Sequence, residues 1–197
     1  MKSGRIVLIV VIVLVVLLGG CTYNAYNGLV KGDQNVKNAW SNVETNYQRR
    51  TDLYNSVIKV VEGSANFEKS TLKEVIEARS KATSITVDIN DPKTLQAYEQ
   101  AQSQFQGSFG KLLAVAESYP DLKTTQAFRD FQTQIEGTEN RIGIARRDFN
   151  TSVNDYNLRV RTFPGNIFAG MFGFKTKEYF QAKPGSENPP DIKFDIK

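Results

Sequence analysis

Apolar residues recur at alternating spacings of three and four along four long stretches of the chain. The stretches run from Val36 to Val61, from Leu72 to Ile85, from Leu95 to Tyr119 and from Phe128 to Phe163. This spacing gathers the apolar side chains on one face of a helix, because an α-helix turns once every 3.6 residues. The pattern therefore predicts four amphipathic helices that pack together as in a coiled coil, rather than strands.

Residues that begin or end helices separate these stretches. Gly63 follows the first stretch, where a glycine can take the left-handed conformation that ends many helices. Pro92 suits the first turn of the third helix, and Pro120 and Pro164 follow the third and fourth stretches. Because the connections are short, neighbouring helices should run antiparallel. We therefore predict an all-α fold, an elongated antiparallel bundle of four main helices in which the shorter second and third helices together cover the length of the longer pair.

The pattern changes beyond the fourth stretch. Aromatic and aliphatic residues crowd into residues 167–180, with glycines close by. A short helical cap on one end of the bundle would explain this composition, because compact domains rarely expose large apolar patches. The alternative is an element that touches a membrane or a partner, with Lys175 and Lys177 meeting anionic headgroups. Residues 182–197 are rich in proline and are expected to form an extended tail.

The N-terminus carries a membrane signal. Lys2 and Arg5 precede an unbroken apolar run from Ile6 to Leu18, and two glycines then lead to Cys21. A charged start, a short apolar run and small residues before a cysteine are typical of a bacterial lipoprotein signal. In that case Cys21 becomes the first residue of the mature chain and receives lipid. The alternative is an uncleaved membrane-spanning helix, although a span needs about 20 apolar residues.

Both interpretations anchor the chain at its N-terminus in a bacterial cell membrane or outer membrane. The positive-inside rule keeps Lys2 and Arg5 in the cytoplasm and so places the bundle outside it. Basic residues soon after the apolar run, beginning with Lys31, leave a cytoplasmic bundle as the alternative. The expected divisions are a signal or anchor over residues 1–20, a tether over 21–33, the bundle over 34–181 and the tail over 182–197.

Composition excludes several kinds of chemistry. The chain has no histidine and one cysteine, which rules out histidine triads, histidine metal sites, internal disulfides and CxxC redox motifs. The formal net charge of +4 comes partly from the N-terminal signal, so a dedicated nucleic-acid binder is not expected. Ser70 and Lys73 match the S-x-x-K pattern of serine acyl-enzymes, but the other elements of such a site are missing. We expect no catalytic, cofactor-binding or metal-binding residues.

Charged residues flank the expected helix interfaces. The pairs Glu74/Glu77 and Glu136/Glu139 each share one side of a helix. Bundles can hold two metal ions on four glutamates, but the known di-iron sites add histidines. We therefore predict a structural ion-pair network that sets the register of the helices. Its predicted members are Glu44, Arg49, Arg50, Glu77, Arg79, Glu136, Glu139, Arg141, Arg146 and Arg147.

Several motifs occur in a characteristic order. Residues 36–44 read VKNAWSNVE, residues 47–50 read YQRR, residues 77–79 read EAR, residues 131–150 read FQTQIEGTENRIGIARRDFN, residues 156–157 read YN, residues 163–164 read FP, residues 172–174 read FGF and residues 179–180 read YF. Over residues 24–181 this order resembles the LemA family of bacterial proteins. The resemblance implies a helical bundle tethered to a membrane by its N-terminus. Since family members often carry a plain transmembrane segment, it also strengthens the alternative of a retained helix.

These observations predict a non-enzymatic envelope protein that presents an elongated surface to a partner protein. The two alternatives are an envelope ligand carrier or hydrolase that uses Glu136 and Glu139, and a membrane-remodelling factor that acts through Phe163–Phe180.

Overall fold

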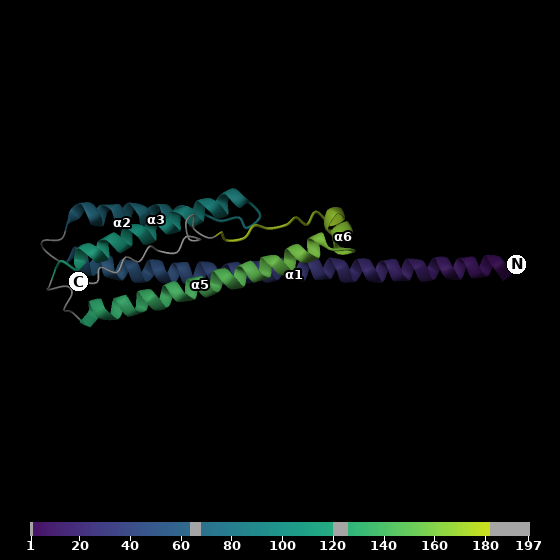
Figure 1. Cartoon of the computed structure of the whole chain (residues 1–197). Coiled ribbons are helices and arrows are strands. Elements are labelled where there is room, and N and C mark those ends of the chain that lie inside the picture. Colours follow the sequence, from purple (N-terminus) through teal and green to yellow (C-terminus); the bar gives the residue numbers. More distant parts are fainter. Residues whose placement is uncertain (1, 64–67, 120–125, 182–197) are drawn as a thin grey trace, which may run out of the picture.

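The computed structural model describes residues 2–63, 68–119 and 126–181. These residues form the helices α1 (Lys2–Glu62), α2 (Lys69–Ser84), α3 (Pro92–Ala116), α5 (Gln126–Arg161) and α6 (Gly165–Phe172), and they contain no strand (Figure 1). The prediction of an all-α bundle with a short C-terminal helical cap is confirmed. The predicted helix boundary at Pro120 and the predicted tail over 182–197 lie outside the described residues.

Helix α1 is a single continuous helix of 61 residues, about 90 Å long. Its apolar run from Ile6 to Leu18 projects beyond the rest of the molecule, and every side chain in that run is between 49% and 66% exposed (Figure 1). The helix continues without a break through residues 21–33, where we expected a tether. Packing against the bundle begins within that segment, because Leu29 is 1% exposed.

The helices form two antiparallel pairs of unequal length. Helices α1 and α5 make the long pair, while α2 and α3 lie side by side over the half of that pair remote from the N-terminus (Figure 1). The prediction that α2 and α3 together cover the length of the long pair was therefore wrong. Residues 173–181 instead run back from α6 toward α2 and α3 as an irregular extended segment (Figure 1).

The core consists of two hydrophobic clusters along α1. The distal cluster joins the end of α1 to α2, α3 and the start of α5, and its largest buried side chains are Tyr54, Phe105, Phe109, Phe128 and Leu112. The proximal cluster lies nearer the exposed apolar run. It joins α1 to the start of α3, to α5 and to the extended segment, and its largest rings are Trp40, Tyr47, Tyr98, Phe149, Tyr156 and Phe180. Both clusters use the apolar face predicted from the spacing of three and four.

Two asparagines on α5 hold the extended segment by its backbone. Asn157 accepts a hydrogen bond from the backbone N–H of Lys177 and donates one to its carbonyl oxygen, both at 2.8 Å. Asn150 does the same for Phe180, at 2.8 and 3.1 Å. The asparagines are seven residues apart and so lie on one face of α5, two turns from each other. An amide side chain can donate and accept at once, so each satisfies a backbone unit that has no strand or helix partner.

The predicted helix ends are confirmed at one site and wrong at another. Pro92 occupies the first turn of α3, and the Asp91 side chain accepts a hydrogen bond from the Lys93 N–H at 3.0 Å as an N-cap. Gly173 ends α6 with a positive φ of 76°, and no other glycine among the described residues has a positive φ. Gly63 therefore ends α1 without the left-handed conformation that we expected there.

The extended segment should contribute strongly to stability through Phe180. Its ring is 6% exposed, and its centroid lies 5.8 Å from that of Trp40 and 5.3 Å from that of Phe149. We expect Phe180→Ala to lower the free energy of unfolding by about 3–5 kcal/mol, because it leaves a cavity in the core. Denaturant titration of the full-length chain in detergent measures the loss, with fluorescence of the single tryptophan, Trp40, as the signal.

The matched control is Leu158→Ala, which removes a side chain that is 52% exposed on α5 and should change the free energy by less than about 0.5 kcal/mol. Equal denaturation midpoints for the two variants would show that residues 173–181 do not belong to the core.

Candidate functional site

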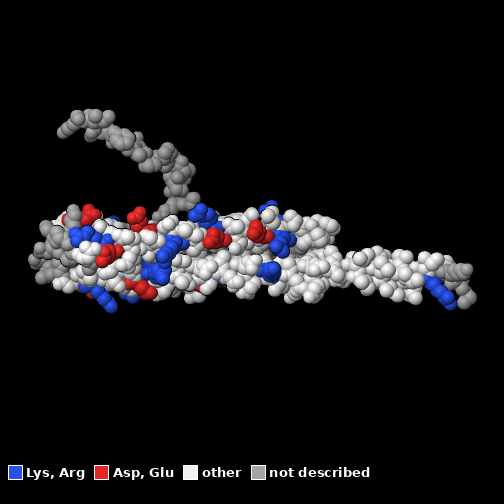
Figure 2. All heavy atoms as spheres, turned by 90° about the horizontal axis from the view of Figure 1, so that it is seen from below, with Lys and Arg blue, Asp and Glu red and all other residues white. Residues whose placement is uncertain are grey.

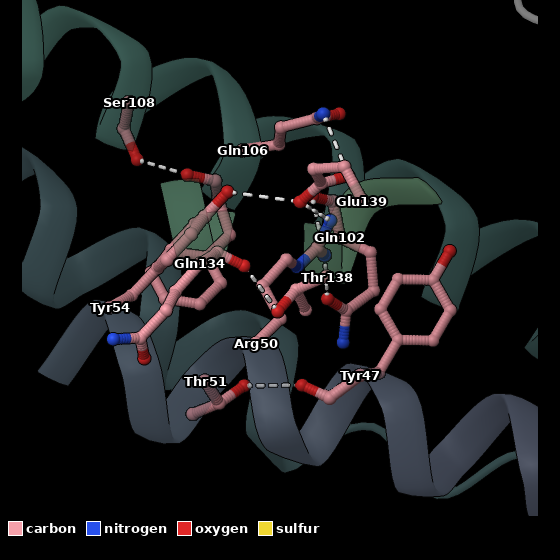
Figure 3. Close-up of polar contacts among 11 residues, drawn as sticks. Tyr47, Arg50, Thr51, Tyr54, Gln102, Gln106, Ser108, Gln134, Thr138 and Glu139 are labelled. Carbon is pink, nitrogen blue, oxygen red and sulfur yellow. Dashed lines mark hydrogen bonds and ion pairs between the residues drawn. The ribbon is translucent and has the colours of Figure 1, made fainter. Parts of the chain in front are cut away.

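Arg50 is a cation on the apolar face of α1. Its position continues the row of α1 positions, spaced by three and four residues, that face the core. Its side chain is 2% exposed and lies between the two hydrophobic clusters. Nη1 lies 3.4 Å from Glu139 Oε1 on α5, and Nη2 donates to the backbone oxygen of Gln102 on α3 at 3.3 Å and to its side-chain Oε1 (Figure 3). Nε has no hydrogen-bond partner among the described residues.

Glu139 gathers the remaining polar groups of this layer. Its Oε1 accepts a hydrogen bond from the Tyr54 hydroxyl and its Oε2 accepts one from Gln106 Nε2, both at 3.1 Å (Figure 3). Gln102 Nε2 also donates to the carbonyl oxygen of Ala82 on α2, at 3.3 Å. We call Arg50, Tyr54, Gln102, Gln106 and Glu139 the polar layer. It connects all four main helices at one level of the bundle.

Aromatic rings complete the surroundings of Arg50. The guanidinium carbon lies 4.7 Å from the ring centroid of Tyr47 and 5.8 Å from that of Tyr54. These rings attract the cation through their electron-rich faces. Burial raises the pKa of both phenols and of Tyr98, and the nearby Glu139 carboxylate raises the pKa of Tyr54 further. The three phenols therefore remain protonated donors well into the alkaline range.

The structure brings together part of the predicted ion-pair set. Arg50 meets Glu139, as described, while Arg146 pairs with Glu99 at 3.7 Å and Glu77 with Lys73 at 3.8 Å. Neither Glu99 nor Lys73 was among the predicted members. The other predicted members make no ion pair with another described residue; they are Glu44, Arg49, Arg79, Glu136, Arg141 and Arg147.

A second buried cation, Lys177, was missed as a core residue. It is 5% exposed, and its Nζ lies 2.9 Å from Asp33 Oδ1 on α1 and 2.5 Å from Asn90 Oδ1. Burial tends to raise the pKa of Asp33, but hydrogen bonds from Lys37 and Lys177 outweigh it and lower the pKa. Lys177 thus points into the bundle and is not available to lipid headgroups. The lack of regular spacing in residues 173–181 gave no signal for this.

Among the concave regions on the described part of the chain, three adjoin the polar layer, the exposed side of α1 and Cys21. A polar cavity of about 220 Å³ opens beside the polar layer, between Arg50, Glu139, Glu99 and Arg146. Burial raises the pKa of Glu99 there, against the opposing effect of Arg146 and of the Gln181 backbone. A shallow groove of about 870 Å³ follows α1 from Ser41 to Ser56 and reaches Gln134 on α5. The third, of about 390 Å³, lies between Cys21, Gly28, Phe163 and Pro164.

The described residues contain no group of three or more histidine, cysteine, aspartate or glutamate side chains that could hold a metal ion. Ser70 donates a hydrogen bond to Glu68 at 2.5 Å, and Lys73 pairs with Glu77 at the surface, so both S-x-x-K side chains engage carboxylates. Of the two glutamates considered for a ligand carrier or hydrolase, Glu136 is exposed and Glu139 accepts hydrogen bonds in the polar layer.

The architecture defines a class of protein: a helical bundle carried on one long helix whose N-terminal part is long and apolar enough to cross a membrane, as a signal sequence also would be. The chain belongs to the LemA family, whose model matches residues 39–194.

The chain is similar in sequence to proteins of several bacteria. The chain is 26% identical over 186 residues to magnetosome protein MamQ 1 of Paramagnetospirillum magneticum and 27% identical over 183 residues to magnetosome protein MamQ of Magnetospirillum gryphiswaldense; each match covers 83% of this chain and 67% of the relative. Protein LemA of Metamycoplasma hominis is 29% identical over 156 residues, covering 79% of this chain and 68% of that protein. The family resemblance deduced from the sequence motifs is therefore confirmed.

The contacts of the polar layer predict that substitutions of two neighbouring glutamates on α5 differ in their effect on the free energy of unfolding. Glu139→Gln removes the negative charge beside buried Arg50, and we expect a loss of about 1–3 kcal/mol in the free energy of unfolding because the cation stays buried without its carboxylate. Glu136→Gln, at an exposed position one turn earlier on α5, is the matched control and should change that energy by less than about 0.5 kcal/mol. Denaturant titration followed by Trp40 fluorescence compares them; equal losses would contradict a stabilising role for the layer.

The buried tyrosines predict alkaline destabilisation. In the unfolded chain a phenol ionises near its ordinary pKa of 10.0, whereas in the folded chain the pKa of Tyr54 is raised. The folded state therefore retains protons that the unfolded state loses, and the free energy of unfolding must fall as pH rises above about 10. Below that pH the stabilising contribution is complete. We expect the free energy of unfolding of the Tyr54→Phe variant to fall less steeply over this range than that of the parent chain. Denaturation at a series of pH values measures both. Parallel curves for the two chains would contradict this contribution of Tyr54.

Proposed function

We propose that this protein is a membrane-anchored interaction protein without catalytic activity, in which a rigid helical bundle holds a protein-binding surface away from the membrane. The observation that carries the proposal is the continuity of α1. The same helix supplies the exposed apolar run and the axis of the bundle core. A continuous helix has no hinge between the two parts, so the bundle follows the orientation of the membrane segment.

The groove on α1 supports this role. It begins at Ser41 and ends near Ser56, which places it roughly 35–57 Å along the helix beyond Leu18. Its α1 wall consists mainly of exposed polar side chains, among them Thr45, Gln48 and Asp52. A shallow, elongated surface of this kind fits a folded partner or a partner helix better than a small molecule, since small-molecule sites are deep and mostly apolar.

Attachment is proposed to occur through the N-terminal 21 residues, either by lipid on Cys21 after cleavage or by retention of the apolar helix. Cys21 is exposed and lies three residues beyond the apolar run, so an acyl chain on it would reach the membrane without any change in the bundle. Lys2 and Arg5 favour a bundle outside the cytoplasm, in the bacterial envelope. The partner is expected to be another envelope protein.

Site-specific photo-crosslinking in intact cells tests the interaction. A photoreactive amino acid at Gln48 in the groove should give a reproducible crosslinked species of defined mass, because a bound partner would lie against that side chain. The same residue at Ser80, exposed on α2 away from the groove, should not. The intact mass of the membrane-extracted chain, measured on the same preparation, distinguishes a lipidated chain that begins at Cys21 from the full-length helix.

Absence of a reproducible crosslink from Gln48, and from further groove positions such as Thr45 and Asp52, would contradict the proposal. Equal crosslinking from Ser80 would show contact without a specific surface.

A further inference from the structure

The bundle end next to the exposed apolar run is itself apolar. Gly165 lets the chain turn back from α5 into α6, because a Cβ at that position would collide with the backbone oxygen of Arg159. Helix α6 then lies against α1 at Tyr26, whose ring centroid is 4.9 Å from that of Phe172. Figure 1 shows α6 as the last part of the bundle before α1 continues alone toward the N-terminus.

Several large apolar side chains on this end face solvent. Phe163 is 80% exposed, Met171 70%, Ile167 52% and Phe172 46%. Ile167 and Met171 are four residues apart and so share one face of α6, opposite the buried Ala169. Elsewhere in the described bundle the exposed large apolar residues are scattered singly, as at Val60 and Ile76. A concentrated patch marks a surface that binds something.

The position of the patch along α1 identifies the occupant. Phe163 and Cys21 border the same cavity, and Cys21 lies three residues, or about 5 Å, beyond Leu18. If the apolar run crosses the hydrocarbon layer, this level of α1 lies at its edge, where aromatic side chains are favoured. If Cys21 is lipidated instead, its acyl chains enter the membrane beside Phe163. Both modes of attachment put the patch at the membrane surface.

Charge around the patch fits a lipid surface. Residues 1–32 and 156–177 contain no aspartate or glutamate, whereas Lys31, Arg159, Arg161 and Lys175 are basic and exposed. In Figure 2 the acidic side chains lie over the rest of the bundle and not over the end from which the bare part of α1 projects. Basic residues beside an apolar face bind phosphate-bearing lipid headgroups while the apolar side chains enter the acyl boundary.

We propose that Phe163, Ile167, Met171 and Phe172 insert into the interfacial layer of the membrane that anchors α1, with Arg161 and Lys175 on the lipid phosphates. The proposal rests on the proposed membrane attachment and adds a second point of contact. One helix entering a membrane leaves the bundle free to rotate about the helix axis. A second contact beside it restricts that rotation and gives the groove on α1 a defined orientation.

Depth-dependent fluorescence quenching in vesicles tests this contact. Full-length Cys21→Ser protein carries one added cysteine, labelled with an environment-sensitive fluorophore. The cysteine replaces Met171 in α6, Ile12 in the apolar run, or, as an exposed apolar control, Ile76 in α2. The vesicles contain phosphatidylcholine, with or without phosphatidylglycerol, and lipids that carry a quencher on the upper acyl chain. We expect lipid quenching of the residue-171 label to be several-fold stronger than that of the residue-76 label.

The other outcomes separate the possible failures. Quenching at residue 12 with water exposure at residue 171 would leave the anchor in place and overturn the second contact alone. No quenching at residue 12 would overturn membrane insertion of the apolar run, and with it the contact beside that run. A residue-171 label shielded from water in proportion to protein density, and insensitive to lipid quenchers, would assign the patch to a second copy of the chain.

A charge variant tests the headgroup contact. In the residue-171 labelled protein, Arg161→Gln with Lys175→Gln should reduce lipid quenching in vesicles that contain phosphatidylglycerol to its level in phosphatidylcholine alone. Unchanged quenching would overturn the assignment of these two residues to lipid phosphates. Trp40 fluorescence confirms that each labelled variant retains the folded proximal cluster, to which none of the substituted residues belongs.

Discussion

The unbroken helix α1 is the constraint on which the remaining structure depends. Its second half contributes side chains to both hydrophobic clusters and to the polar layer, and its first half is the exposed apolar run. An isolated helix of this length would gain little stability from propensity alone, since most helical stability in proteins comes from packing one face. The bundle therefore stabilises α1 over residues 29–62, and the proposed membrane attachment would give the projecting part the apolar surroundings that the bundle does not provide.

The polar layer divides the core and gives it one register. A buried ion pair rarely adds net stability over an apolar core, because both charges lose water. Arg50 reduces this cost with carbonyl, amide and carboxylate acceptors from two other helices and with two aromatic rings. Sliding α3 or α5 by one turn would separate it from Gln102 or Glu139 and leave a cation buried alone. Apolar residues of similar size on either side would tolerate such a slip, so the layer specifies the alignment that the two clusters alone do not.

The sequence pattern was sufficient for the helices but not for everything that joins them. Periodicity located the four main helices because each buries a single face, and local chemistry located the start of α3 at Asp91 and Pro92. The heptad position of Arg50 indicated that it needed a partner, but the choice of Glu139 over Glu136 depends on how α1 and α5 align. The extended segment could not be predicted, because it follows no periodicity and is held by Asn150 and Asn157 from a distant part of the chain. For the same reason the core position of Lys177 could not be predicted.

The extended segment also explains how the two ends of the bundle differ. Helices α2 and α3 cover the distal half and carry charged side chains on its surface. The proximal half consists of α1, α5, α6, the extended segment and the start of α3. Its polar interactions point inward, with Lys177 on Asp33 and the two asparagines on backbone groups. Basic and apolar side chains remain to face outward at that end. Under the proposed membrane attachment, such a molecule would turn its acid-free end toward lipid and its charged end toward water, so the proposed orientation follows from the fold itself.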